Sequence, residues 1–384
     1  MKKVLISTKS FPPVIGGSAF LLYEILRHFP EDYFSVVHGV NDPPGKESDL
    51  NLRFKRKQVK FLSAQNTPRA TRYLPGIYQR LIEYFLQKEV SKGHIRKVYA
   101  HYPNGVFLVA AYKVAKKNRL PLVVYFDILW DSTSTGAELA LSEKYEAEIV
   151  AYANEVFAIT EFACEYLSQK HKKEVKLIPH TVDTGIIRDI QINQEHTRKK
   201  IHFAGGIYDK MNSDSVLRMV EAVEKLDREI ELEFCSPDLP EALRNKGYKN
   251  SYVNKAELIT LQRTSSILYL PQAFHSDKPN MIKNNFPTKV MEYVCSGVPI
   301  LLHSPEDSYL TYIASKEGFA FIVDEADEDA LSKGIERLLD DMELRASLVQ
   351  KAFEFARSRD SERWAARLKT SLDSINYNSS SVRL

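Results

Sequence analysis

The chain has 384 residues, of which 44% are hydrophobic and 27% charged, and its net charge is +3 at pH 7. This composition excludes disorder, collagen and coiled coil as the main structure, and the length predicts two or three domains. The three cysteines (Cys164, Cys235 and Cys295) are odd in number and far apart. They favour a reducing compartment over a disulfide framework.

The N-terminus is basic and leads into a short apolar run, which is typical of a first strand and not of a signal peptide. No run approaches the ~18 apolar residues that a membrane-spanning helix needs. We therefore expect a cytoplasmic protein.

Short β-branched runs alternate with amphipathic segments through residues 1–190. Strands are expected at 3–7, 33–39, 60–62, 98–101, 122–126, 155–159 and 175–179. Helices are expected at 20–29, 77–90 and 139–154. This alternation is typical of a parallel α/β domain.

The same alternation returns after residue 200. Strands are expected at 201–204, 230–234, 251–253, 267–270, 299–302 and 320–323, with helices at 213–226, 255–264 and 289–296. Residues 188–199 are polar and fit a linker, and residues beyond 342 fit helices. The fold class predicted is therefore α/β: two Rossmann-like, doubly wound domains, 1–190 and 191–356, facing across a cleft. A C-terminal helix (about 357–384) can pack back on the first domain.

The charge is unevenly distributed. Residues 1–190 carry 27 Lys and Arg against 20 Asp and Glu, and residues 51–100 alone carry 12 against 2. Such a block can attract an anionic membrane, a phosphate-bearing substrate or nucleic acid, or it can simply be a solvated surface. No nucleic-acid-binding module accompanies it, so we expect no nucleic-acid partner.

Two segments carry the strongest site signals. In the first βα turn, Gly16 and Gly17 precede a helix and allow close approach of a ligand, although a tight turn explains them equally well. In the second segment Pro287, Thr288 and Lys289 open an expected helix, which places a hydroxyl and a cation at its start. Glu292, one turn on, can accept hydrogen bonds from a ribose diol, or it is an exposed glutamate on an amphipathic helix.

This second segment resembles the donor-binding motif of family 4 glycosyltransferases, which have the GT-B fold. The family has two glutamates separated by seven residues, followed by Gly-x-Pro. Glu292 matches the second glutamate, and residues 297–299 match the strand entry. Asn284 stands where the family has its first glutamate, which contacts the donor sugar.

Four further segments are similar to the same family, in the expected order: 12–17, 126–131, 178–183 and 203–208. Two departures accompany them. Phe126 replaces a basic residue, and Gly206 or Ile207 stands where an arginine for the donor phosphates is usual, which leaves Lys210 as the nearby cation.

The resemblance implies transfer of a sugar from a nucleotide-diphosphate sugar to an acceptor hydroxyl, with retention at the anomeric carbon, in cell-surface polysaccharide or glycolipid assembly. The expected donor-binding residues are Gly16, Gly17, Gly206, Lys210, Asn284, Asn285, Phe286, Pro287, Thr288, Lys289 and Glu292. Asp127, at the end of an expected strand, is the catalytic candidate that contacts the acceptor or assists proton removal, with a helix cap or turn as the alternative.

No cofactor is expected beyond the nucleotide sugar, and no metal. The acidic residues 324–329 are expected to cap a helix rather than to bind a divalent ion. The acceptor would be a sugar or a lipid-linked sugar, and the basic block together with the apolar helix near 77–86 can rest on an anionic membrane.

Other functions stay open. An epimerase of the same fold would convert the donor without an acceptor, and a non-catalytic relative would bind a nucleotide sugar and turn nothing over. A phosphorylase is disfavoured because no pyridoxal lysine site is recognisable, and a nicotinamide oxidoreductase because the Gly-x-Gly-x-x-Gly fingerprint is absent.

Overall fold

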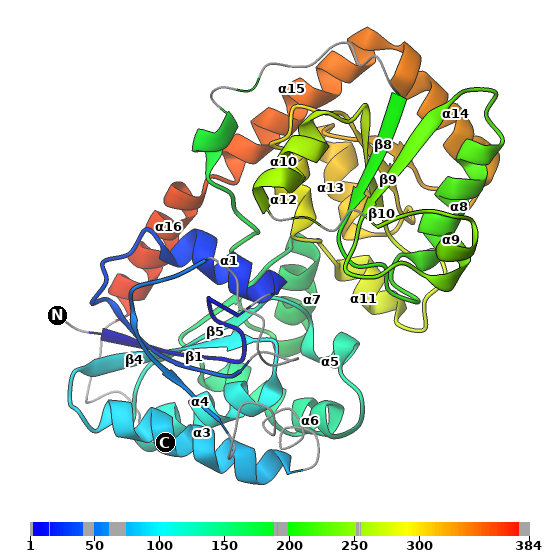
Figure 1. Ribbon diagram of the computed structural model, residues 1–384. Coiled ribbons are helices and arrows are strands. Elements are labelled where there is room, and N and C mark those ends of the chain that lie inside the picture. The colour runs from blue at the N-terminus through cyan, green and yellow to red at the C-terminus, as the bar shows by residue number, and fades with distance from the viewer. Residues whose placement is uncertain are drawn as a thin grey trace. The chain divides into compact units, whose positions relative to one another are not determined.

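A computed structural model describes residues 3–14, 16–40, 50–60, 74–187, 190, 199–250, 253 and 255–375. The chain divides into two compact units (Figure 1). Unit 1 comprises Met1–Thr181 and Ser361–Leu384, and unit 2 comprises Val182–Asp360. The sequence placed these boundaries at 190 and 356. Expected linker residues 188–189 and 191–198 lie outside the described residues.

Unit 1 is built on a parallel sheet in the order β3-β2-β1-β4-β5-β6-β7. Its strands are β1 (Lys3–Thr8), β2 (Phe34–His38), β3 (Lys55–Gln58), β4 (Ile95–Tyr102), β5 (Leu122–Phe126), β6 (Glu155–Ala158) and β7 (Lys176–Leu177). Its helices are α1 (Gly17–Leu26), α3 (Pro75–Val90), α4 (Gly105–Lys117), α5 (Trp130–Thr133), α6 (Gly136–Tyr152), α7 (Glu161–His171) and α16 (Ser361–Ser374).

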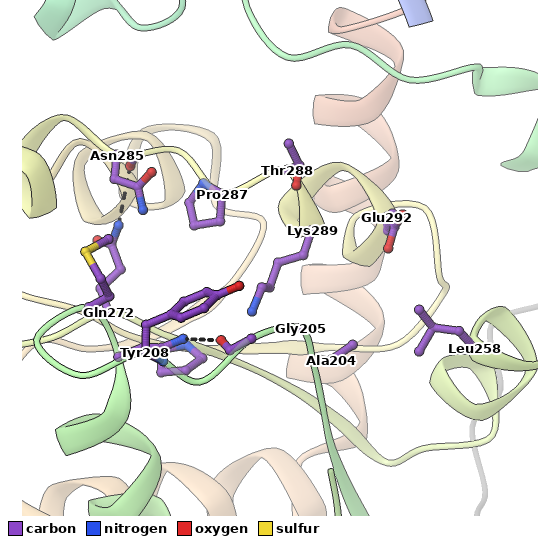
Figure 2. A pocket seen from close by; sticks show the side chains of 14 residues that line it. Ala204, Gly205, Tyr208, Leu258, Gln272, Asn285, Pro287, Thr288, Lys289 and Glu292 are labelled. Atoms are coloured by element: carbon purple, nitrogen blue, oxygen red, sulfur yellow. Dashed lines mark hydrogen bonds between the residues drawn. The ribbon is translucent and has the colours of Figure 1, made fainter. Parts of the chain in front are cut away.

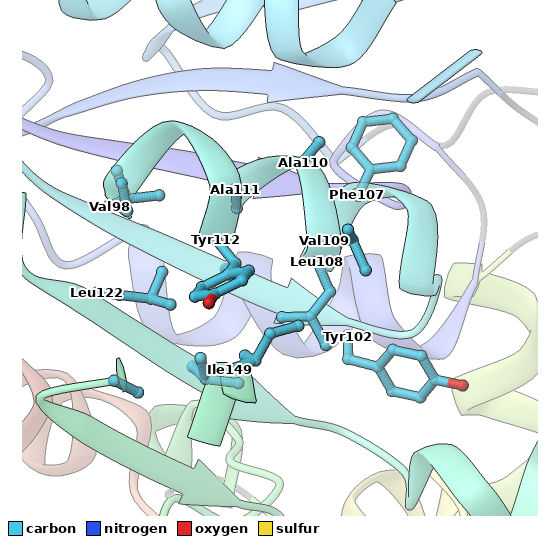
Figure 3. Packing of buried hydrophobic residues seen from close by; sticks show 14 of the residues in the cluster. Val98, Tyr102, Phe107, Leu108, Val109, Ala110, Ala111, Tyr112, Leu122 and Ile149 are labelled. Atoms are coloured by element: carbon cyan, nitrogen blue, oxygen red, sulfur yellow. The ribbon is translucent and has the colours of Figure 1, made fainter. Parts of the chain in front are cut away.

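Both faces of this sheet are covered, as a parallel sheet requires. Helices α3 and α4 lie on one face and helices α1 and α16 on the other (Figure 1). On the first face, the α4 side chains pack on Val98, Leu122 and Ile149 (Figure 3). On the second face, Leu368 and Leu372 of α16 join the core, and the Tyr33 hydroxyl donates to Asp373 over 2.6 Å. The C-terminal helix is therefore part of unit 1.

Unit 2 holds a second parallel sheet, in the order β12-β11-β10-β8-β9. Its strands are β8 (Lys199–Ala204), β9 (Ile230–Cys235), β10 (Ile267–Pro271), β11 (Ile300–His303) and β12 (Phe321–Val323). Its helices are α8 (Ser213–Glu224), α9 (Glu241–Asn245), α10 (Lys255–Arg263), α11 (Pro279–Asn284), α12 (Lys289–Tyr293), α13 (Tyr309–Glu317), α14 (Glu328–Asp340) and α15 (Met342–Ser358), with a short 3-10 turn at Thr184–Ile187.

The predicted α/β class with two parallel sheets is confirmed, and most strands lie where the sequence placed them. Three differences stand out. Helix α4 was not predicted, because its first eight residues are all buried and its lysines (Lys113, Lys116 and Lys117) come only in its second half. The third strand lies at Lys55–Gln58 instead of 60–62, and residues 61–62 are outside the described part. Val253 is in no strand, and residues 251–252 of that expected strand are also outside the description.

The strand order locates the ligand-binding edge of each sheet. In unit 1 the chain moves away in opposite directions from β1 and β4, and in unit 2 from β8 and β10. Ligands of doubly wound sheets bind at the carboxyl ends of the strands at such a switch point.

Within the described ranges, no helix combines the length and the apolarity that crossing a bilayer would require.

Candidate functional site

A pocket of about 400 Å³ opens at the switch point of unit 2 (Figure 2). It is lined by the ends of β8 and β10, the loop after β8, the start of α10 and the segment that leads into α12. The lining residues are Ala204, Gly205, Gly206, Tyr208, Met211, Asn212, Leu258, Pro271, Gln272, Asn285, Pro287, Thr288, Lys289 and Glu292. This volume lies within the range of small-molecule sites in proteins.

Two glycines, Gly205 and Gly206, allow the side chains of Lys289 and Tyr208 to lie close to the loop after β8. Gly205 has φ +113°, and a Cβ there would lie 2.8 Å from the Lys289 Nζ. A Cβ on Gly206 would overlap the Tyr208 ring. At Gly205 both the positive φ and the approach of Lys289 favour glycine, whereas a side chain at Gly206 would require the exposed Tyr208 ring to move.

The loop is fixed by Asn212, which is 7% exposed. Its side chain accepts a hydrogen bond from the Tyr208 backbone N over 2.9 Å and donates one to the Gly206 carbonyl over 3.0 Å. The backbone N of Ala204 donates to the Tyr293 hydroxyl over 2.9 Å, which ties the end of β8 to α12. The two halves of the pocket are thus held together by buried polar contacts.

Helix α12 is shorter than the sequence predicted. It runs from Lys289 to Tyr293, with Thr288 as its N-cap, whereas a helix to residue 296 was expected. Pro287 precedes the helix and does not lie in its first turn. The chain then turns through Gly297, at φ +81°, into β11. Because α12 has only five residues, Lys289 is a firmer basis for anion binding than a helix dipole.

Lys289 is the electrostatic centre of the pocket. Its Nζ lies 4.2 Å from the centre of the Phe203 ring, and the side chain points toward Gly205 and the ring of Tyr208 (Figure 2). Removal from water lowers the pKa of Lys289 to about 8, although the nearby Glu292 carboxylate opposes this shift. An anion placed beside the ammonium group would restore the lost solvation and favour the charged form.

The lining residues follow an order along the pocket (Figure 2). Leu258 and Glu292 lie at one end, Lys289 lies in the middle, and Gln272 and Asn285 lie at the other end. The pocket therefore presents an apolar and acidic end, a cationic centre and an amide-bearing end.

Six of the residues predicted from the sequence meet in this pocket: Gly206, Asn285, Pro287, Thr288, Lys289 and Glu292. Three do not line it. Lys210 is exposed and pairs with Asp277 over 3.1 Å. The Asn284 amide donates to the Asn280 carbonyl over 2.8 Å within α11. Phe286 is buried and packs against Tyr309 and Phe355.

Several lining residues were not predicted: Ala204, Gly205, Tyr208, Met211, Asn212, Leu258, Pro271 and Gln272. One signal was available for Gln272, which is a polar residue directly after a buried strand. Such positions lie at the carboxyl edge of a parallel sheet.

The remaining predicted site residues lie in unit 1. Asp127 directly follows β5, is 7% exposed and accepts a short hydrogen bond from the Ser18 hydroxyl of α1. Gly16, at φ +152°, occupies the N-cap of α1, and Gly17 is the first residue of that helix. Asp127 and the glycine turn are thus neighbours. Leu129, not Asp127, is the N-cap of α5, so Asp127 does not cap that helix.

Burial raises the pKa of Asp127 to about 6, while the Ser18 hydrogen bond acts in the opposite direction. A carboxylate with this pKa is ionised at neutral pH and can still accept a proton readily.

The acidic residues after β12 cap a helix, as predicted. The Asp327 carboxylate accepts from the Ala330 backbone N over 2.7 Å, and Lys225 pairs with both Glu328 and Asp329. Among the residues that the structure describes, no three His, Cys, Asp or Glu side chains gather as a metal site would require.

Comparison with known proteins supports the predicted resemblance. Residues 188–355 match the family model of "Glycosyl transferases group 1". No curated protein is significantly similar to the chain.

Solved structures agree in fold. Anabaena HepE in complex with UDP superposes with a TM-score of 0.70 at 12% identity, over 97% of this chain and 100% of that one. Sucrose-phosphate synthase from Thermosynechococcus elongatus gives 0.72 at 13% identity, over 97% and 98%. The α,α-trehalose 6-phosphate synthase from Burkholderia multivorans gives 0.65 at 13% identity, over 97% of each chain. The chain therefore has the GT-B fold, and residues 188–355 are similar to the group 1 glycosyl transferases.

The lowered pKa of Lys289 can be measured directly. In an NMR titration of the ¹³C-methylated protein, the Lys289 resonance should titrate near pH 8, and Lys289→Met identifies that resonance. Because the folded pKa lies below the usual 10.5, the cost of burying the charge is present below pH 8 and disappears as the pH rises to 10.5. A midpoint above 10 would show that Lys289 is fully solvated.

Asp127 should produce the opposite pH dependence in unit 1. Its folded pKa of about 6 exceeds the usual 3.8, so its contribution to stability is complete below pH 3.8 and is lost as the pH rises to 6. Asp127→Asn should therefore be more stable than the wild type above pH 6, by roughly 3 kcal/mol at most. Urea unfolding at several pH values checks this, and a difference that does not change between pH 4 and 7 would contradict it.

Proposed function

We propose that the protein is a glycosyltransferase that moves a sugar from a nucleotide-diphosphate sugar to an acceptor hydroxyl. The observation that carries the proposal is the order of groups in the pocket of unit 2. A carboxylate, a buried cation and neutral amides follow one another in that pocket. The same order of chemical demands is found along a nucleotide sugar: a ribose diol, a diphosphate and a sugar.

The nucleoside would bind at the end formed by Leu258 and Glu292. The Glu292 carboxylate has two oxygens that can accept hydrogen bonds from both ribose hydroxyls. The apolar surface of Leu258 and Ala204 lies at the same end and can cover a base. This division of roles does not select a particular base.

The diphosphate would bind at Lys289. Thr288 also lines the pocket, and the absence of a Cβ at Gly205 and Gly206 allows an anion to approach the backbone closely. When the bond between the anomeric carbon and the phosphate oxygen breaks, negative charge grows on the leaving nucleoside diphosphate. A cation already fixed in the pocket stabilises that charge without having to reorganise.

The structures of HepE add support for this choice of ligand. They contain UDP, UDP-glucose, or UDP together with glucose. At 12% identity they share the fold with this chain, and a nucleotide-sugar donor and a sugar acceptor are therefore part of the proposal.

The acceptor would bind to unit 1 near Asp127. The acceptor oxygen forms the new bond to the anomeric carbon, and its proton passes to a base, for which the Asp127 carboxylate is the candidate. Retention at the anomeric carbon and a role in polysaccharide or glycolipid assembly are parts of the proposal that rest on the family resemblance alone.

Two alternatives use the same pocket. An epimerase would change the donor without an acceptor, and a non-catalytic relative would only bind it. One observation favours the non-catalytic relative. Lys210 pairs with Asp277 and does not line the pocket, so Lys289 is the one cation among the lining residues that can stabilise the leaving group. Incubation of the donor with and without sugar acceptors, followed by analysis of the products, separates the three functions.

Replacing Glu292 tests the pocket assignment. Glu292→Gln should weaken the binding of the preferred nucleoside diphosphate about tenfold or more, because a charged acceptor is lost. A thermal-shift panel of UDP, GDP and ADP finds the preferred ligand, since ligand at ~100 times its dissociation constant adds about 2.7 kcal/mol of stability. Glu343→Gln, an exposed glutamate on α15, is the matched control. Equal affinity for both variants would remove Glu292 from the site.

A lipid-linked acceptor would require contact with a membrane, and α3 offers a suitable face. Leu74, Ile77 and Tyr84 are 45%, 52% and 59% exposed, and the exposed Arg80 and Lys88 follow the same helical stripe. Apolar and basic side chains on one face favour an anionic bilayer surface. The proposal therefore includes a peripheral position on the membrane.

Vesicle sedimentation tests this position. The protein should bind vesicles that contain anionic lipid at low salt, and the combined variant Arg80→Glu and Lys88→Glu should lose most of that binding through charge repulsion. Neutral vesicles serve as the control. Equal sedimentation of the wild type and the variant would contradict a role for α3.

A further inference from the structure

Gln272 is a buried polar residue in the pocket wall that the sequence did not indicate. It follows β10 directly and is 1% exposed. Its backbone N donates to the His303 carbonyl over 2.9 Å, and its own carbonyl accepts from the Ser215 hydroxyl over 2.5 Å. The backbone is therefore held between β11 and α8, and Gln272 lines the pocket.

The surrounding contacts fix which way the Gln272 amide points. The Asn285 carbonyl lies 3.4 Å from one end of the amide (Figure 2). A carbonyl oxygen only accepts hydrogen bonds, so the group that faces it is Nε2. Oε1 then faces the Ser304 hydroxyl at 2.7 Å, and that hydroxyl must donate.

A buried chain of hydroxyls supports this arrangement from behind. The Ser304 Oγ lies 2.8 Å from the Ser308 Oγ, and Ser308 caps α13 by accepting from the Thr311 backbone N over 3.0 Å. The side chains of Ser304, Ser308 and Thr311 are all buried. Buried polar networks of this kind hold their members in one orientation, since a rotated member would leave a polar atom unpaired.

One N–H of the amide remains for a ligand. A primary amide has two, and the described contacts give Nε2 a single acceptor, the long bond to Asn285. Apart from Lys289 and Glu292, every residue that lines the pocket is uncharged, and these uncharged residues include Gln272 and Asn285 at this end. This end therefore offers amide hydrogen bonds and no compensation for a charge, which would be costly to bury here.

We propose that Gln272 reads the transferred sugar: its free Nε2–H donates to a sugar hydroxyl, and the uncharged surroundings select a neutral hexose over a hexuronate. The assignment rests on the proposed function, because it places the diphosphate at Lys289 and the sugar at the end opposite Glu292. Of the two amides that the sequence suggested for this task, Asn284 and Asn285, Asn284 is bonded within α11. Ser304 is a positioning residue that acts through Gln272.

Calorimetry on the full-length protein separates sugar binding from nucleotide binding. Dissociation constants are measured for UDP, GDP and ADP and for their glucose conjugates. Gln272→Met keeps the length of the side chain and should weaken the glucose conjugate about tenfold, while the nucleoside diphosphate stays within about twofold. Ser304→Ala frees Oε1 and should weaken the same conjugate by a smaller factor. Ser332→Ala removes a buried hydroxyl on α14 that is not part of the pocket lining, and it should change the affinity for neither ligand.

The outcomes are distinct. If none of the nucleoside diphosphates binds the wild type, the proposed function fails and this inference fails with it. If one binds, but Gln272→Met and Ser304→Ala weaken both ligands equally or neither, the inference alone is wrong. Selective loss of the glucose conjugate in both variants supports it. If the glucuronate conjugate of the same nucleotide binds the wild type as tightly as the glucose conjugate, selection of a neutral sugar is wrong.

Discussion

The site depends on one cation that is mostly removed from water. The Lys289 ammonium group lies against the Phe203 ring and beside Gly205, where removal from water lowers its pKa to about 8. Such a group gains more from a bound anion than a solvated lysine does, because the anion replaces the lost hydration. The remaining lining residues arrange what lies on either side of it: a carboxylate and an apolar residue toward one end, and neutral amides toward the other.

The fold explains why these groups meet. Phe203 and Ala204 end β8, and Pro271 ends β10. Because the chain leaves these two neighbouring strands in opposite directions, no connecting segment among the described residues covers the space between their carboxyl ends. The contact from Ala204 to the Tyr293 hydroxyl holds the motif helix against this edge. Unit 1 also has a polar contact that joins a helix to the carboxyl edge of its sheet. The short hydrogen bond between Ser18 and Asp127 connects α1 to the end of β5.

The sequence predicted what depends on local pattern. Alternating runs located most strands, and the short motif around Lys289 and Glu292 located the pocket. It did not predict α4, because the first half of that helix is buried all round and shows no amphipathic period. It also assigned Asn284 and Lys210 to the donor. In the structure the Asn284 amide is bonded within α11, and the Lys210 side chain pairs with Asp277. A polar residue after a buried strand indicates that Gln272 lies at the sheet edge. Its proposed role depends also on Ser304 and Asn285, which are distant in sequence, so the local pattern does not indicate that role.

The central claim is that the pocket of unit 2 binds the nucleotide sugar. Hydrogen exchange of the full-length protein, measured with and without the glucose conjugate that stabilises it most, tests this most directly. Peptides that cover 203–212 and 285–293 should exchange more slowly with ligand, and peptides from α14 should not change. Stabilisation by the ligand without protection of those two segments would show that it binds elsewhere and would contradict the account.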